Sequence, residues 1–326
     1  MITALLLAFV SLVSSYQIAL NPQSIHESNQ VIEYYVNLQG QANTCGISQN
    51  IPCMHLYTVL QQVRFKEQVL IHVADGTYEL PLSTFQYFNY NDSVFPIVDI
   101  VAEEDAQIKL EEQYQSIGQV IISFTNFSID FADLFFQIDD DGSSLKFSSC
   151  NIFRNAGNTA INSHSLVIVD RGSLILEKMN ITGNILEGNE ALIQSSQPLL
   201  IQFTSLNITR LSLMSENVEP LLLSVTEHDL NSQILVQDVH MKWNYAGNKA
   251  EADIIYIHMK DQNTRKNDDS STKPILLIEN SEIIQNTLAP IQESCAIQIE
   301  GLKPQQILIK NSTINNRSPP NNDKQY

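Results

Sequence analysis

A short apolar frame recurs along most of the chain, and this repeat constrains the fold more than any other feature of the sequence. In its clearest copy, Leu174, Leu176, Met179, Ile181 and Asn184 form the pattern L-x-L-x-x-M-x-I-x-x-N. Seven copies follow one another at intervals of 25 to 42 residues, a period that is typical of repeat architectures. The copies begin at Val120, Leu145, Leu174, Ile201, Ile234, Leu276 and Ile307.

Each frame predicts two short strands separated by a bend. Apolar residues alternate with other residues, which is the period of a strand with one buried face. The skipped place between the second and third apolar residues predicts the bend. A further apolar patch after the frame predicts a third strand, and such patches lie at residues 159–161, 190–193, 219–223, 253–257 and 295–299.

The repeat therefore predicts an all-β fold, a parallel β-helix. One turn of three short strands cannot bury its apolar face alone, but stacked turns share one continuous core. No long helical pattern interrupts the strands, which argues against β-α-β crossovers. A β-sandwich is the alternative, because it also has many short strands, but the repeated register of one frame disfavours it.

Residues 1–15 predict a cleaved signal peptide, because an apolar run from Ala4 to Val13 is followed by small residues. The alternative is a buried N-terminal strand. No later segment has the ~20 uninterrupted apolar residues that a membrane span needs, so we expect no membrane span. The β-helix coils are expected over residues 81–317, and residues 318–326 form a polar tail with Pro319 and Pro320.

Residues 16–80 are expected to form the N-terminal region and cap of the β-helix. Cys45 and Cys53 flank a loop of seven residues, and in an oxidising compartment they predict a disulfide. Zinc is the weaker alternative, since no C-x-x-C or clustered His accompanies them. Apolar residues at helical spacing from Leu56 to Val63 predict a short amphipathic helix that covers the core, and Gln68–Val73 is expected to be the first strand.

The cap and the repeats resemble two known groups of proteins. The order Cys45-Gly46, Pro52-Cys53, helix, strand and then Ala74-Asp-Gly-Thr-Tyr78 resembles the start of right-handed parallel β-helix proteins of the pectin-lyase-like superfamily. The repeats resemble a degenerate form of the polymorphic outer-membrane protein repeat, whose hallmarks are F-x-x-N and G-G-A-I. Ile152-Phe-Arg-Asn155 and Ala160-Ile161 are examples of what remains of these motifs. The resemblance implies a right-handed parallel β-helix and bears on the fold far more than on function.

Enzymes of the superfamily supply templates for catalysis that this sequence does not match. The chain lacks the G-H-G and R-I-K strings of polygalacturonases and the R-x-P-x-x-R string of pectate lyases. With 18 Lys and Arg against 36 Asp and Glu, the net charge is −18. Such an acidic chain is poorly suited to nucleic acid or to anionic membrane surfaces, and it would repel an acidic polysaccharide unless calcium bridged the two.

Two sets of asparagines are candidate functional or structural sites. The last Asn of the frame is expected at one corner of successive coils, where amides form a hydrogen-bonded ladder or, alternatively, plain exposed turns. These residues are Asn155, Asn184, Asn244 and Asn286. N-x-S/T sequons predict glycan acceptors, with Asn126, Asn180 and Asn207 sharing one outward position. The six sequons lie at Asn91, Asn126, Asn180, Asn207, Asn311 and Asn316.

The remaining polar candidates have a structural alternative that is favoured. Asp139, Asp140 and Asp141 form an acidic cluster before Gly142 that is a weak candidate for calcium, because it lacks the spacing of a full calcium loop. A solvated turn is the favoured interpretation. Cys150 occupies an inward position of the frame, so we expect a buried thiol. No other cofactor is indicated.

Together these features predict a secreted or cell-surface β-helix protein without catalytic activity. It would act in binding or adhesion, or as an extracellular structural element, with carbohydrate or an extracellular protein as partner. The alternative is a polysaccharide lyase or glycoside hydrolase acting on acidic, pectin-like polysaccharide. A further alternative is a piece of a larger surface protein.

Overall fold

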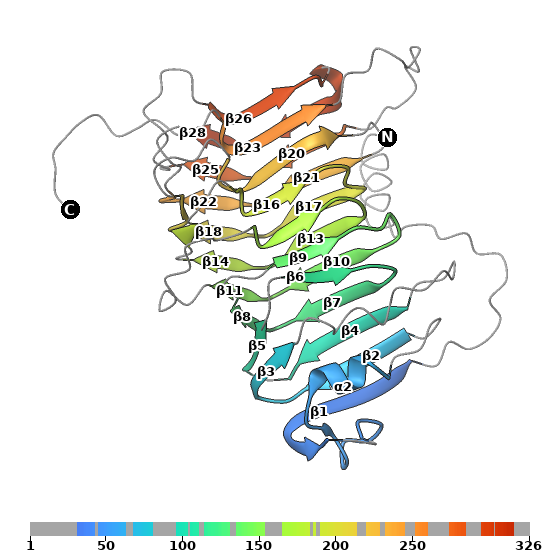
Figure 1. The fold of residues 1–326 in the computed structure, drawn as a ribbon. Coiled ribbons are helices and arrows are strands. Elements are labelled where there is room, and N and C mark those ends of the chain that lie inside the picture. Colours follow the sequence, from blue (N-terminus) through green and yellow to red (C-terminus); the bar gives the residue numbers. More distant parts are fainter. Residues whose placement is uncertain are drawn as a thin grey trace, which may run out of the picture. The chain divides into compact units, whose positions relative to one another are not determined.

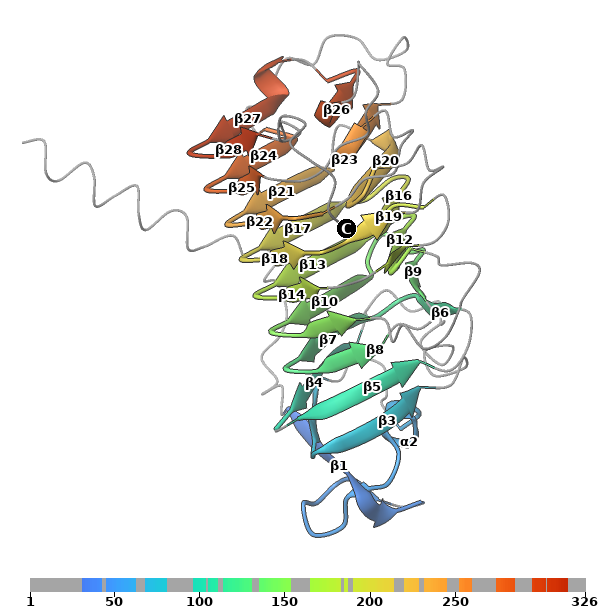
Figure 2. The ribbon, with the colours of Figure 1, turned by 90° about the vertical axis from the view of Figure 1, so that its left-hand side faces the viewer.

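Parallel strands stacked in three sheets form the protein, as the computed structural model shows in Figures 1 and 2. All the strand pairs within these sheets are parallel. The structure describes residues 31–42, 45–62, 68–80, 96–103, 105–110, 114–130, 135–153, 165–182, 185–186, 190–213, 220–228, 232–244, 252–259, 274–284, 295–302 and 304–315. The predicted signal peptide and polar tail lie outside these residues.

We number the sheets 1 to 3. Sheet 1 contains β1 (Ile32–Gln41), β2 (Gln68–Val73), β4 (Ile97–Ala102), β7 (Ile121–Thr125), β10 (Ser144–Ser148), β13 (Ser173–Glu177), β17 (Leu200–Thr204), β21 (Gln233–Gln237), β24 (Leu276–Glu279) and β27 (Ile307–Lys310). Sheet 2 contains β3 (Gly76–Leu80), β5 (Ala106–Leu110), β8 (Ser128–Asp130), β11 (Asn151–Phe153), β14 (Asn180–Thr182), β18 (Asn207–Thr209), β22 (His240–Lys242), β25 (Glu282–Ile284) and β28 (Thr313–Asn315). Sheet 3 contains β6 (Tyr114–Ile117), β9 (Phe135–Ile138), β12 (Val167–Val169), β16 (Ile193–Ser195), β20 (Leu223–His228), β23 (Ala252–Met259) and β26 (Cys295–Glu300). A small pair, β15 (Ile185–Leu186) and β19 (Ser212–Leu213), lies between strands of sheets 2 and 3 in the chain, and a 3₁₀ turn spans Pro304–Gln306.

The chain visits the three sheets in turn, which makes the fold a right-handed parallel β-helix. One coil runs through β4, β5 and β6, and the next through β7, β8 and β9. Equivalent frame positions stack directly: Leu174 pairs with Leu145 on one side and with Ile201 on the other. The prediction that repeated frames form the coils of a β-helix is therefore confirmed.

The predicted bend between the two strands of the frame is a single residue in a left-handed conformation. Lys178, for example, has φ of 53°, and its backbone N–H donates to the Thr204 carbonyl of the next coil at 2.9 Å. The left-handed turn changes the chain direction, while the hydrogen bond keeps adjacent coils in register. The residues at this position are Asn126, Ser149, Lys178, Ser205, Asp238, Asn280 and Asn311, with φ between 47° and 65°.

Inward side chains of the three sheets fill one continuous core. Phe124 and Phe147, on adjacent strands of sheet 1, stack with ring centroids 5.5 Å apart. Phe136 from sheet 3 lies 5.7 Å from Phe147, and Phe127 meets Phe124 edge-on at 6.1 Å. All four rings are at most 1% exposed. These contacts join the sheets, since aromatic rings bury large apolar area and pair favourably at such distances.

The N-terminal cap forms as the sequence predicts. Helix α2 (Leu56–Leu60) buries Leu56, Val59 and Leu60 completely, and it contacts β1 and β3, which are end strands of sheets 1 and 2. The helix thus covers apolar side chains where the stack of coils begins. It is the one α-helix among the described residues, and no described helix has the length and apolar character that a membrane crossing requires.

One copy of the frame lies two residues later than the sequence predicts, beginning at Ile122 instead of Val120. Sheet 1 pairs Leu145 with Ile122 rather than with Val120, and Phe147 with Phe124. Val120 and Ile122 are both fully buried, so the alternating pattern continues through both residues and a shift of two leaves it unchanged. The left-handed bend at Asn126 identifies the correct copy.

Two predicted strand positions also needed correction. The first strand is β1, not Gln68–Val73, which is β2 and pairs alongside it. Residues 159–161 lie outside the described residues, and the strand of sheet 3 in that coil is β12, at Val167–Val169. A longer polar stretch precedes β12 in the sequence, so this strand lies later than the spacing of the other coils predicts.

Candidate binding surface

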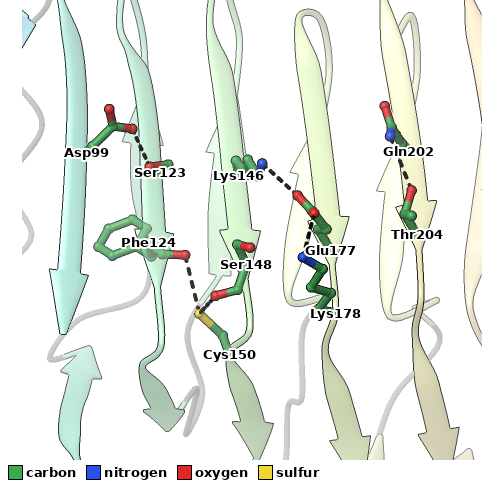
Figure 3. Close-up of polar contacts among 10 residues, drawn as sticks. All are labelled: Asp99, Ser123, Phe124, Lys146, Ser148, Cys150, Glu177, Lys178, Gln202 and Thr204. Atoms are coloured by element: carbon green, nitrogen blue, oxygen red, sulfur yellow. Dashed lines mark hydrogen bonds and ion pairs between the residues drawn. The ribbon is translucent and has the colours of Figure 1, made fainter. Parts of the chain in front are cut away.

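The outer face of sheet 1 carries a row of polar side chains that runs across neighbouring coils. Alternation directs every second residue of these strands outward, and β4, β7, β10, β13 and β17 lie side by side (Figure 3). Adjacent strands are ~4.8 Å apart, so outward side chains of neighbouring coils are within hydrogen-bonding reach. We call the following residues the polar row: Asp99, Ser123, Lys146, Glu177, Gln202 and Thr204.

Direct contacts fix most of the polar row in place. The Ser123 hydroxyl donates to Asp99 Oδ1 at 2.6 Å, joining β4 to β7. Lys146 Nζ lies 2.7 Å from Glu177 Oε2 and joins β10 to β13. Within β17, Gln202 Nε2 donates to Thr204 Oγ1 at 3.2 Å. Figure 3 shows these three contacts as separate pairs on neighbouring strands.

Polar contacts continue beyond the polar row toward the end of sheet 1. Gln237 Nε2 on β21 donates to Glu279 Oε2 on β24 at 3.3 Å, and Lys310 Nζ on β27 lies 3.9 Å from Glu279 Oε1. The outer face of sheet 1 therefore presents amide, hydroxyl and charged groups from β4 to β27, interspersed with outward apolar side chains. Among these are Ile175, Leu235, Leu277 and Leu308.

The electrostatics of the polar row centre on Glu177. The hydrogen bond from Lys146 holds the pKa of the Glu177 carboxyl below its ordinary value, and Lys178 Nζ at 3.6 Å acts in the same direction. The carboxylate therefore stays charged and accepting near neutral pH. Partly exposed donors and acceptors in fixed positions are the groups that bind sugar hydroxyls or the polar rim of a protein partner.

A second cluster lies on the first strands of sheet 1. Tyr35 stacks on His72 with ring centroids 5.0 Å apart, and its hydroxyl donates to Glu33 Oε2 at 2.7 Å, which raises the pKa of the phenol. His72 Nδ1 lies 3.3 Å from Glu103 Oε1, and its Nε2 is 3.9 Å from Glu33. The cluster ties β1, β2 and the end of β4 together at the cap.

A third cluster lies on sheet 3, where β23 and β26 pair. His258 Nδ1 is 2.9 Å from Glu300 Oε2, and the Tyr256 hydroxyl donates to the same oxygen at 3.3 Å. Gln298 Nε2 donates to Glu300 Oε1 at 2.9 Å. These contacts, with the one from His258 foremost, lower the pKa of Glu300. A histidine held through Nδ1 by a carboxylate keeps Nε2 available, which is an arrangement that general bases share.

The cysteine predictions are confirmed where the structure describes the side chains. Cys45 and Cys53 form a disulfide, with Cα atoms 4.8 Å apart. Cys150 is a buried free thiol whose Sγ lies 3.4 Å from the carbonyl oxygens of Phe124 and Ser148. Burial raises the pKa of this thiol to about 11, so it is protonated and unreactive at neutral pH.

The described sequons lie on sheet 2 and on the bend before it. Asn180 and Asn207 are exposed, pair directly in register, and are joined by a 3.5 Å hydrogen bond from Asn207 Nδ2 to Asn180 Oδ1. Asn126 does not share their position: it lies at the left-handed bend, as does Asn311, because its copy of the frame starts at Ile122. All four side chains are exposed, and glycosylation of each stays a prediction. Asn91 and Asn316 lie outside the described residues.

The predicted asparagine ladder is described at one of its four members. Asn244 is buried, and its amide binds the backbone of the preceding coil, accepting from Leu211 N at 2.8 Å and donating to the Ile208 carbonyl at 3.2 Å. The ladder itself stays a prediction, since the other three members lie outside the described residues. These are Asn155, Asn184 and Asn286.

The acidic cluster lies in the turn from β9 to β10. Asp140 Oδ1 accepts from the Gly142 N–H at 2.9 Å, and the Asp140 carbonyl accepts from Ser143 N at 3.0 Å, as in a tight turn. Among the described residues, no three His, Cys, Asp or Glu side chains are placed to share a metal ion. Calcium at Asp139, Asp140 and Asp141 stays a prediction.

Sequence reasoning missed the polar row and both histidine clusters. His258 and Glu300 are separated by 42 residues, and only the register of β23 with β26 brings them together. The outward positions of the frame carried the signal for the polar row, since they are rich in Ser, Thr, Gln, Lys and Glu. The frame had been defined by its apolar positions alone.

Comparisons with known proteins give no family assignment. No protein-family model matches the chain, and no curated protein sequence matches it. Among solved structures, a rhamnogalacturonan lyase aligns with 86% of this chain and 87% of its own, at 12% sequence identity and a TM-score of 0.28.

Proposed function

We propose that this chain is a secreted or cell-surface β-helix protein that binds an extracellular partner without catalysis, through the polar row on sheet 1. The observation that carries the proposal is the polar row itself, with contacts that join β4 to β7 and β10 to β13. Side chains held in advance lose little conformational freedom on binding, which favours affinity. The predicted signal peptide and the disulfide support an extracellular location.

Carbohydrate is the partner class that the chemistry of the polar row favours. Hydroxyl and amide groups of Ser123, Gln202 and Thr204 are of the kind that bind sugar hydroxyls. The net charge of −18 disfavours a polyanionic chain, so a neutral glycan is the better ligand. The alternative partner is an extracellular protein with a polar surface.

A screen of the purified secreted protein against immobilised neutral and acidic glycans tests the proposal. Retention on a glycan without turnover is the expected result. Turnover would be followed by the absorbance of unsaturated products and by new reducing ends, with and without calcium. Turnover of any glycan in the screen would contradict the non-catalytic proposal.

The alternative is a lyase or hydrolase acting on acidic polysaccharide, and one observation favours it. His258, held by Glu300 beside the Tyr256 hydroxyl, is the best-placed base among the described residues. If turnover is found, loss of activity in His258→Gln with retained glycan binding would support this alternative. Turnover that needs calcium would instead direct attention to Asp139, Asp140 and Asp141.

A further inference from the structure

Trp243 is an exposed aromatic side chain at a corner of the β-helix. It follows β22 of sheet 2 directly, it is 62% exposed, and it is the single tryptophan of the chain. Its φ is 57°, a left-handed conformation that is rare and strained for a bulky residue. The surrounding structure must therefore hold this residue in place.

Asn244 supplies much of that support. Its amide is 1% exposed, although it comes directly after an exposed residue. The two hydrogen bonds of this amide, to Leu211 N and to the Ile208 carbonyl, attach the corner to the preceding coil. Because Asn244 is fixed inward, the backbone at Trp243 is fixed too, and the indole stays exposed to solvent.

The surroundings of Trp243 are polar. Lys242 Nζ lies 2.8 Å from Glu282 Oε2, and His240 Nδ1 lies 3.4 Å from the same oxygen. Arg210, exposed and also left-handed with φ of 58°, occupies the equivalent corner of the preceding coil, since Thr209 pairs with Lys242. Within the described part of the chain, no other exposed large apolar side chain lies on or next to a strand of sheet 2.

We infer that Trp243 is a stacking platform for a pyranose ring, and that it forms a carbohydrate subsite with Lys242, Glu282 and Arg210. The face of an indole carries negative charge and attracts the partly positive C–H groups on the apolar face of a sugar ring. Lys242, which precedes Trp243 in the chain, and Arg210, at the equivalent corner of the preceding coil, supply the charged groups that would bind the sugar hydroxyls. A protein-binding hot spot would instead need a ring of apolar neighbours that excludes water, whereas the described neighbours of Trp243 include Lys242 and Arg210 beside the half-buried Ile284.

This inference rests on the proposed function in one respect, the choice of carbohydrate as ligand. It concerns a different surface, since the polar row lies on sheet 1 and Trp243 follows a strand of sheet 2. The two surfaces are therefore tested separately.

The single tryptophan allows a direct test by fluorescence. The full secreted protein is titrated with hexasaccharides of cellulose, xylan, galactan and oligogalacturonate, while Trp243 emission and its quenching by acrylamide are recorded. We expect one of the sugars to shift the emission saturably and to protect the indole from acrylamide. No change with any of the four hexasaccharides would overturn the inference.

Variants provide the second arm of the test. Because these variants lack the fluorescent indole, their affinity and that of wild type for the responding sugar are measured by isothermal titration calorimetry. Trp243→Ala is expected to weaken binding about tenfold, and Trp243→Phe by less, because a smaller ring remains. Leu199→Ala is the matched control, since Leu199 is another exposed apolar residue, 48% exposed, and should bind normally. Circular dichroism confirms that each variant is folded, and equal affinity for Trp243→Ala and wild type would overturn the inference.

The two proposals fail in different ways. Glycan retention that depends on the polar row, with unchanged Trp243 emission, would overturn the Trp243 subsite alone. If polar-row variants retain glycans normally and Trp243 still responds to sugar, only the assignment of binding to the polar row would be overturned.

Discussion

Lys146 Nζ on β10 lies 2.7 Å from Glu177 Oε2 on β13, and this ion pair joins two successive coils across the outer face of sheet 1. Both side chains are partly exposed, at 38% and 27%. The pair therefore lies where a ligand can reach it, and it also contributes modestly to the register of the coils.

The Lys146–Glu177 pair predicts a pH-dependent contribution to stability. The pKa of Glu177 is lowered from its ordinary value of 4.5 in the folded protein, chiefly by Lys146. The contribution is therefore present above pH 4.5 and is lost as the pH falls through the lowered pKa. Because the pair is partly exposed, we expect Lys146→Met to cost only about 0.5 kcal/mol at pH 7.

Urea unfolding at pH 7 and pH 3 checks this prediction. The difference between wild type and Lys146→Met should be smaller at pH 3 than at pH 7, because Glu177 becomes protonated as the pH falls through its lowered pKa. A difference that is the same at both pH values would contradict the role of Glu177.

Gly172 is expected to tolerate no side chain. Its φ is 83°, and a Cβ there would lie 2.5 Å from the Asp140 carbonyl oxygen and 2.6 Å from that of Ser143. Gly172→Ala should therefore destabilise the protein by more than about 1 kcal/mol, measured by urea unfolding. Gly142→Ala, at an exposed position without positive φ in the β9–β10 turn of the preceding coil, should be close to neutral. Equal stability of the two variants would show that the turns are not packed as described.

The phenylalanine cluster is expected to contribute strongly to stability. Phe147 contacts Phe124 and Phe136 and is fully buried, so Phe147→Ala should cost about 3–5 kcal/mol. Thermal and urea unfolding measure the loss, and Phe147→Leu should cost less because it leaves a smaller cavity. Leu199→Ala, at an exposed site, should change stability by less than about 0.5 kcal/mol. If Phe147→Ala lowered the free energy of unfolding by less than Leu199→Ala does, a core shared by the sheets would be contradicted.

Cys150 is expected to be unreactive until the protein unfolds. Burial raises the pKa of its thiol to about 11, so the reactive thiolate is scarce at pH 8. Alkylation is measured in a Cys295→Ser background, where Cys150 is the remaining cysteine outside the Cys45–Cys53 disulfide. We expect negligible labelling of the native protein and complete labelling in denaturant. Native labelling at the rate of an exposed thiol would place Cys150 outside the core.

Much of the fold was predictable because inward residues repeat. The alternation at Leu174 and Leu176 and the skip before Met179 directly encode two strands and a bend, which β13, Lys178 and β14 form. Alternation alone could not set the register near Val120, since a shift of two residues buries the same face. Near Val120 the bend at Asn126 decides which residues pair with β10. The alternation of apolar residues does not reveal the position of this bend.

The candidate sites were less predictable because outward contacts form between coils. Lys146 meets Glu177, and His258 meets Glu300, only after the strands are paired, and the interval between coils varies with the length of the connections. Asn244 was predicted at a corner, and it lies at one. Its buried bonds to the backbone of the preceding coil are a tertiary feature that the residue type alone does not specify.

Glycan retention by polar-row variants tests the account most directly. Wild type, the double variant Lys146→Ala/Gln202→Ala and the control Lys109→Ala/Gln107→Ala on sheet 2 are compared on the glycans that retain the wild type. The account predicts that the control is retained like wild type, while the polar-row variant loses retention and keeps its fold by circular dichroism. Equal retention of all three proteins would contradict binding through the outer face of sheet 1.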